Sequence, residues 1–135
     1  MQPSFAATYE ATPETVGIVR NQMAALAGDC GLSEPAIADV KLAVSEAATN
    51  ALIHGYRERD GRIHVEATLT GDELVISIRD EGLGMQPRSD SPGLGLGLPV
   101  IASVAKRLEI LDDDGPGTRL QMAFACPCTP AALVA

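Results

Sequence analysis

The sequence has no tryptophan and few aromatic residues of any kind. Two tyrosines and two phenylalanines make up 3% of the 135 residues. Hydrophobic residues nevertheless account for 46% of the chain, and many of them are alanines, so a core can be buried. This composition suits helices that pack small side chains against a sheet. The length fits one domain of ordinary size.

Basic residues are also scarce. The 10 lysines and arginines are scattered along the chain and are outnumbered by 18 aspartates and glutamates, which gives a net charge of -8. A surface that follows nucleic-acid phosphates needs clustered basic side chains. The sequence therefore argues against direct nucleic-acid binding. An acidic surface is compatible with a basic protein partner and helps to keep a domain in solution.

Long apolar runs and paired cysteines are missing too. No apolar stretch approaches the ~18 residues of a membrane span, and the N-terminal stretch lacks the basic start and apolar run of a signal peptide. The three cysteines, Cys30, Cys126 and Cys128, are an odd number, which favours reduced thiols in an unexported chain. Cys126-Pro127-Cys128 is not a zinc-ligand spacing. We therefore expect a cytoplasmic protein without membrane contact.

Hydrophobic periodicity predicts the element order βααββαββ. Thr12 before Pro13, and Ser33 before Glu34, are typical of capped helix starts. The expected strands are 4–10, 63–69, 74–79, 109–112 and 119–124, and the expected helices are 13–27, 34–54 and one that ends near residue 108. Helices on one face of a mixed, mostly antiparallel sheet form an α/β (α+β) two-layer sandwich. We expect one domain, 1–125, and a flexible tail, 126–135.

The first polar cluster lies on the second expected helix. Glu46, Asn50 and His54 are four residues apart and share one face, beside the apolar stripe. A carboxylate there could accept a proton, and an amide oxygen could hold a hard cation. The alternative is an amphipathic helix with polar flanks, in which His54 makes only a structural hydrogen bond.

Two glycine-rich segments follow. Asp80, Gly82 and Gly84 come directly after a strand, where a carboxylate can accept hydrogen bonds from a ligand amino group and glycines allow close backbone approach. The alternative is a plain turn. The second segment opens a helix, whose free amides can bind phosphate, although a flexible loop is equally compatible. It consists of Gly93, Leu94, Gly95, Leu96, Gly97 and Leu98. Neither the dinucleotide fingerprint nor a Walker A loop is present.

Together and in this order, the three clusters resemble the boxes of the GHKL (Bergerat-type, HATPase_c) ATP-binding superfamily. The segment SEAATNALIHGY at 45–56 is similar to the N box of anti-sigma factor serine/threonine kinases of the SpoIIAB/RsbW type. RDEGLG at 79–84 resembles their next box, and Gly117-Thr118 followed by Leu120 and Met122 resembles their closing strand. The resemblance covers residues 5–125.

The resemblance implies a role for each motif residue. Asp80 would accept a hydrogen bond from the adenine amino group, supported by Thr118, with Gly82 and Gly84 beneath the base. Asn50 would hold Mg²⁺, and the amides of the segment 93–98 would contact the ATP phosphates. Glu46 would be the catalytic base, and His54 would lie near the nucleotide.

One loop departs from this family. Only eight residues, Met85 to Pro92, separate the two glycine boxes, whereas the ATP lid of these kinases is usually longer. Arg88 is the only basic residue there that could stabilise the transition state. The departure bears on the rate of phosphoryl transfer more than on nucleotide binding.

The resemblance predicts a regulatory kinase. It would phosphorylate a Ser or Thr of an anti-anti-sigma (STAS-type) partner and sequester a sigma factor. Two alternatives stay open: a nucleotide-gated protein-binding module with little catalysis, and a slow ATP hydrolase. Relatives are commonly dimers, and the first strand and helix could supply a homodimer interface.

Overall fold

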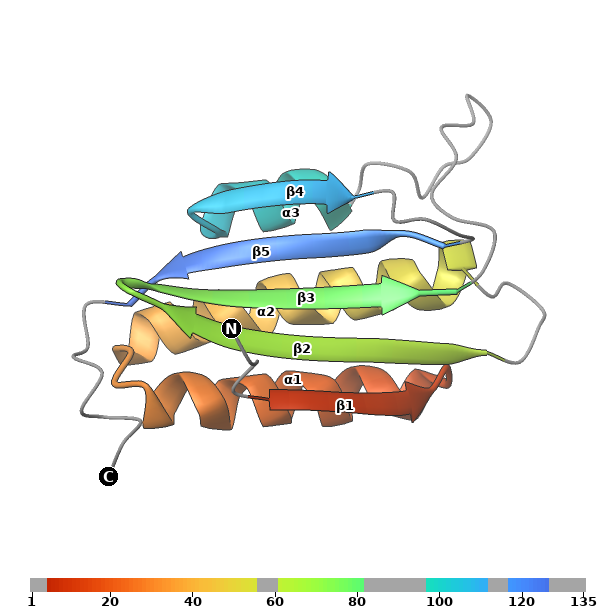
Figure 1. The fold of residues 1–135 in the computed structure, drawn as a ribbon, viewed down its shortest axis with the longest axis horizontal. Coiled ribbons are helices and arrows are strands. Elements are labelled where there is room, and N and C mark those ends of the chain that lie inside the picture. The colour runs from red at the N-terminus through yellow and green to blue at the C-terminus, as the bar shows by residue number, and fades with distance from the viewer. Residues whose placement is uncertain (1–4, 56–60, 82–96, 112–116, 127–135) are drawn as a thin grey trace.

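The computed structural model describes residues 5–55, 61–81, 97–111 and 117–126. A five-stranded sheet and a layer of helices make up this part of the chain (Figure 1). The strands are β1 (Phe5–Glu10), β2 (Arg62–Thr70), β3 (Glu73–Asp80), β4 (Arg107–Leu111) and β5 (Arg119–Ala125). The helices are α1 (Pro13–Asp29), α2 (Glu34–Asn50), the π-helical turn η1 (Ala51–Gly55) and α3 (Gly97–Val104).

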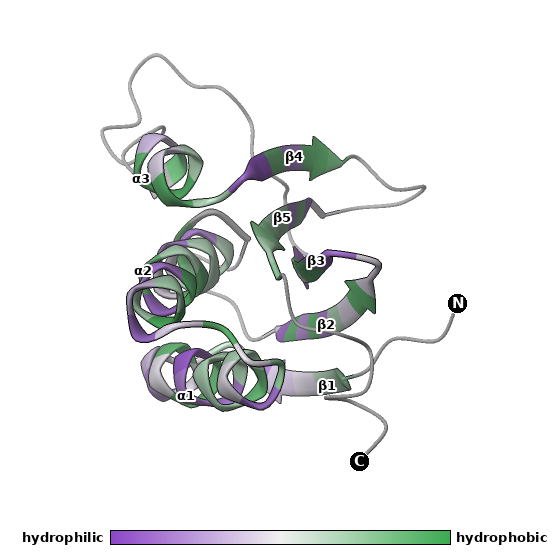
Figure 2. Cartoon of the chain, turned by 90° about the vertical axis from the view of Figure 1, so that its left-hand side faces the viewer, coloured by the Kyte–Doolittle hydropathy of each residue, from purple (hydrophilic) through white to green (hydrophobic). Residues whose placement is uncertain are grey.

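The sheet has the strand order β1-β2-β3-β5-β4, with every neighbouring pair antiparallel. The predicted two-layer sandwich is confirmed, because α1, α2 and α3 all lie on one face of the sheet (Figure 2). The expectation of a mixed sheet is wrong for the described strands. β5 returns between β3 and β4 and runs antiparallel to both.

The core lies between the two layers. On β3, Leu74, Ile76 and Ile78 face the helix layer and are shielded from water, and Ser77 on the other face is buried as well. The long helix α2 contributes small and β-branched residues at helical spacing to the same core. They include Val40, Val44 and Ala47, which are all fully buried. Alanines let the helix approach the sheet closely, which explains how a core forms with so few aromatic side chains.

The two predicted helix starts differ in detail. Ser33 caps α2 as expected, because its hydroxyl accepts a hydrogen bond from the Ala36 amide at 3.3 Å. Thr12 occupies the N-cap position of α1, but its side chain makes no cap hydrogen bond. The Thr12 hydroxyl instead pairs with the Thr15 hydroxyl at 3.1 Å. Pro13 still fixes the first helical residue of α1.

Two helix ends were predicted wrongly. The second helix was expected to stay α-helical to His54, but it changes to π-helical geometry at Ala51. The third was expected to end near Leu108, but it ends at Val104. There the Lys106 amide donates to the Ala123 carbonyl at 2.8 Å, and Leu108 pairs with Met122. Sheet pairing thus overrides the helical periodicity of this segment.

The cysteine expectation holds only in part. Cys30 is a free thiol, fully buried at the end of α1, and burial raises its pKa. Cys126 is disulfide-bonded, which contradicts the expectation of reduced thiols throughout. The expected tail beyond Cys126 lies outside the described residues. Among the described helices, none is long and apolar enough to cross a membrane.

Candidate functional site

Buried polar residues gather where β3 ends and β5 begins. Asp80, the last residue of β3, is 4% exposed, and Thr118, just before β5, is 8% exposed. The Asp80 amide donates to the Thr118 carbonyl at 3.0 Å, so the two residues are held side by side. A carboxylate so far from water is costly unless it is hydrogen-bonded. Asp80 and Thr118 both have polar partners.

Gly117 fixes the geometry at this point. Its φ is 105°, which side chains rarely adopt, and a Cβ at Gly117 would lie only 2.0 Å from the carbonyl oxygen of Asp80. Only glycine allows the chain to pass this close to the end of β3. The sequence GT at 117–118 therefore serves to bring Thr118 against Asp80.

The end of α2 reaches the same place. Asn50, its last residue, is 6% exposed, and the π-helical turn η1 that follows contacts β3. Within the described part of the chain, the Asn50 side-chain amide makes no hydrogen bond. Its carbonyl oxygen and amide nitrogen can therefore serve a ligand. π-Helical turns inside longer helices are frequent at functional sites.

Glu46 lies one turn before Asn50 on α2. Its side chain is half-buried, so an external group can reach the carboxylate. Glu46 and Asn50 therefore lie near the end of α2, at the same end of the two layers as Asp80 at the end of β3. The arrangement combines a proton acceptor, a neutral oxygen ligand and a buried hydrogen-bond acceptor.

Sequence reasoning missed a polar pair beside Asp80. His64, on β2, lies with its Nε2 atom 2.6 Å from Oε2 of Glu81, the residue after Asp80, and its Nδ1 atom 3.0 Å from the Thr8 hydroxyl. The hydrogen bond with His64 is the main cause that lowers the pKa of Glu81. The alternation of β2 predicted only that His64 faces away from the helices. Its cross-strand neighbours, Thr8 and Arg79, follow from the register.

Much of the predicted phosphate-binding region lies outside the described residues. Gly97 begins α3, and Leu98 next to it is half-buried and packs against the core. The His54 backbone belongs to η1, whereas its side chain is not described. The other predicted site residues outside the described ranges are Gly82, Gly84, Arg88, Gly93, Leu94, Gly95 and Leu96. Their roles, and the eight-residue lid, stay predictions.

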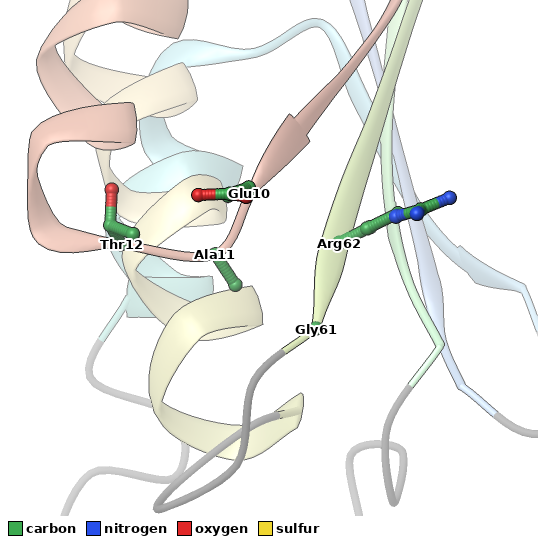
Figure 3. Close-up of a pocket in the computed structure, with 5 residues that line it drawn as sticks. All are labelled: Glu10, Ala11, Thr12, Gly61 and Arg62. Carbon is green, nitrogen blue, oxygen red and sulfur yellow. The ribbon is translucent and has the colours of Figure 1, made fainter.

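A separate pocket of about 440 Å³ lies at the edge formed by β1 and β2 (Figure 3). It is lined by Glu10, Ala11, Thr12, Gly61 and Arg62. Glu10 and Arg62 point in opposite directions in this view, so the two charges do not converge on one point. Among the described residues that line it, none is a predicted site residue. In the described ranges, no three His, Cys, Asp or Glu side chains cluster as metal ligands.

The chain is similar to several proteins named anti-sigma F factor. The anti-sigma F factor of Clostridium kluyveri is 39% identical over 97 residues, which cover 64% of this chain and 68% of that protein. The anti-sigma F factor of Clostridium acetobutylicum is 34% identical over 125 residues, covering 84% and 87%. That of a Thermoanaerobacter species is 36% identical over 114 residues, covering 76% and 80%.

A solved structure shares the fold. The crystal structure of the RsbU and RsbW domains of a Mycobacterium tuberculosis protein matches with a TM-score of 0.70 at 24% identity. The match covers 95% of this chain and 33% of that one, so this chain spans about a third of its length. The sequence also matches the histidine kinase-like ATPase domain over residues 9–124. Because that match spans most of the chain, this protein belongs to the family of histidine kinase-like ATPase domains, which bind ATP.

Proposed function

We propose that this protein is an ATP-dependent serine/threonine kinase that acts as an anti-sigma factor. The observation that carries the proposal is the placement of Asp80, Asn50 and Thr118, all buried, at one end of the fold, with Glu46 one turn away and accessible. The similarity to proteins named anti-sigma F factor supports the same function.

Asp80 is proposed to bind the adenine amino group. Its carboxylate is an acceptor held in place by the sheet, and the backbone bond to Thr118 keeps the two residues together. A buried, charged acceptor discriminates well against ligands that lack the matching donor, because the unpaired group then loses its hydrogen bonds. Gly82 and Gly84 would form the wall beneath the base, and the amides of residues 93–98 would bind the phosphates.

Asn50 fits a magnesium ligand, because it offers a neutral oxygen at a residue that is only 6% exposed and makes no side-chain hydrogen bond with other described residues. Mg²⁺ bound there would neutralise phosphate charge. Glu46 is proposed to accept the proton of the attacking Ser or Thr hydroxyl. The hydroxyl oxygen then forms a bond to the γ-phosphorus while the bond from that phosphorus to the ADP oxygen breaks. A positioned base contributes ~10²–10⁴-fold.

The wider assignments form part of the same proposal. Residues 1–125 are taken as one catalytic domain that works in the cytoplasm. Its partners are a sigma factor and a STAS-type anti-anti-sigma protein, the latter being the phosphoacceptor. β1 is an edge strand, so this strand with α1 is a reasonable surface for a homodimer.

Transfer of radiolabel from γ-labelled ATP tests the proposal. The purified protein should label a STAS-type protein encoded in the same genome, and Glu46→Gln should abolish labelling while keeping ATP affinity. Ser45→Ala, at the neighbouring position on α2, is the matched control and should label normally. Absence of transfer to every STAS-type protein of that genome would refute the kinase function.

A nucleotide-gated binding module is the second candidate. The short segment between the glycine boxes favours it, because a lid of eight residues offers few phosphate contacts. In that case Glu46→Gln leaves sigma-factor binding and its ATP dependence unchanged. A slow hydrolase, the third candidate, would release phosphate from ATP without any partner.

A further inference from the structure

Large hydrophobic side chains are exposed at few positions in the described ranges. They are Ile18, Leu42, Ile53 and Ile110, with exposed fractions of 46%, 43%, 46% and 50%. Two of these four lie near Glu46: Leu42 is on α2, four residues before it, and Ile53 is on η1, seven residues after it. Exposed apolar residues scattered singly need no explanation, but a set arranged around a proton acceptor does.

Leu42, Glu46, Thr49 and Ile53 are separated by four, three and four residues, so they follow one side of α2 and η1. We call this set the α2 stripe. The Thr49 hydroxyl donates to the Ser45 carbonyl at 2.7 Å, so its polar group is already bonded to the helix backbone. The stripe is therefore apolar except for the Glu46 carboxylate near its centre.

The dimensions of the stripe suit a peptide segment. At 1.5 Å per residue, Leu42 and Ile53 lie about 16 Å apart along the axis, with Glu46 between them. A hydroxyl that gives its proton to Glu46 must come within hydrogen-bond distance of the carboxylate. A polypeptide that brings such a hydroxyl to the middle of a helix must also cover the residues one turn before it and two turns after it.

We infer that the α2 stripe is the docking surface for the phosphoacceptor segment of the protein substrate. The inference rests on the proposed kinase function and names the partner's chemistry: a Ser or Thr between apolar side chains. Asp39 lies three residues before Leu42, so one carboxylate borders the stripe and a second, that of Glu46, lies within it. The acceptor segment should therefore carry basic rather than acidic neighbours, because like charges would repel it.

The small apolar area of the α2 stripe favours a transiently bound substrate over a second copy of this chain. Stable dimers bury roughly 1,200–2,000 Å² in total, far more than two leucine-sized side chains provide. A small apolar patch around a reactive group instead gives a few anchoring contacts whose loss weakens binding sharply. Weak docking also suits turnover, since the phosphorylated product must leave.

The test uses the full chain, with a STAS-type protein of the same genome as the probe. Leu42→Ser, Ile53→Ser and the double variant are compared with Ile110→Ser, which removes an equally exposed side chain on β4. Calorimetric ATP titration verifies that each variant is folded and binds nucleotide. Binding of the probe is measured with ATP present, and steady-state labelling gives KM and kcat separately.

The double variant should raise both the dissociation constant and the KM for the probe at least tenfold, with kcat within threefold of wild type. Ile110→Ser should change neither value by more than twofold. Unchanged binding in the double variant overturns the docking assignment even if the protein is a kinase. Binding that depends on the stripe without any labelling sustains docking and refutes the kinase function. If wild type binds no STAS-type protein, or if the variants change the oligomeric state, the inference is wrong.

Discussion

The two ends of the helix and sheet layers differ in the polarity of their buried side chains. At one end lie Asn50, Asp80 and Thr118, three of the five polar residues that are buried in the described ranges. We call this the polar end. At the opposite end, which we call the sealed end, the buried side chains are apolar or sulfur-containing: Cys30, Leu32, Leu74, Phe124 and Cys126.

Charge is handled differently as well. At the sealed end, Glu73 meets Lys106 and Arg107, each at 3.0 Å, so the carboxylate is matched by cations at the surface. At the polar end, Asp80 and Asn50 are both buried, with exposed fractions of 4% and 6%. Burying polar groups contributes less to stability than burying apolar ones. The comparison indicates that the sealed end contributes more to the stability of the fold, whereas the proposed function places the ligand at the polar end.

The largest loss of stability is expected at Gly117, where the chain passes close to the end of β3. Gly117→Ala should destabilise the protein by about 4 kcal/mol, because backbone strain and a steric overlap with Asp80 add together. Gly71→Ala is the matched control: its φ is also positive, at 58°, but no atom lies within 4 Å of the added Cβ. The control should lose only about 1 kcal/mol. Urea unfolding measures both, and equal losses would contradict the close approach at Gly117.

The second largest effect is expected from a substitution that creates a cavity at the sealed end. Leu74→Ala removes a fully buried side chain and should lower the free energy of unfolding by about 3 kcal/mol. ATP affinity of the folded protein should stay within twofold of wild type, because Leu74 lies near the start of β3 and Asp80 is its last residue. Chemical unfolding and calorimetric titration of the same preparation provide the two numbers. A large loss of affinity would show that the two ends are not independent.

The sequence predicts this division only in part. The spacing of Glu46 and Asn50, and the position of Asp80 at a strand end, are local features, so they could be predicted. The contact of Gly117 with Asp80 joins residues far apart in the chain, as does the pairing of His64 with Glu81. Leu108 shows the same limit, since its helical spacing is overridden by the partner strand β5. Periodicity describes one element at a time, whereas these features depend on which elements become neighbours.

A substitution at the polar end should have the opposite effect to Leu74→Ala: it should lower ATP affinity more than it lowers stability. Asp80→Asn keeps the shape of the side chain but removes the charged acceptor, so ATP affinity should fall about 30-fold, or about 2 kcal/mol. The free energy of unfolding without nucleotide should change by less than this. Calorimetric titration with ATP, with and without Mg²⁺, measures the affinity. If Asp80→Asn binds ATP as wild type does, the carboxylate does not contact the base.

The smallest effect concerns the surface charges of the sealed end. Hydrogen bonds from Arg107 and Lys106 lower the pKa of Glu73 from 4.5 to about 2. A carboxyl whose folded pKa is depressed stabilises the fold fully above its unfolded pKa, and this contribution is lost as the pH falls through the folded pKa. The stability difference between wild type and Glu73→Gln should therefore be constant above about pH 5 and shrink steadily toward pH 2.

Urea unfolding at several pH values between 7 and 2.5 checks this dependence. Glu109→Gln is the matched control, because Glu109 also contacts Arg107, at 3.4 Å, yet its removal leaves Glu73 with both cations. That variant should keep the pH dependence of wild type. A difference between wild type and Glu73→Gln that does not vary with pH would mean that the ion cluster adds nothing to the stability of the sealed end. Its apolar side chains alone would then distinguish the sealed end from the polar end.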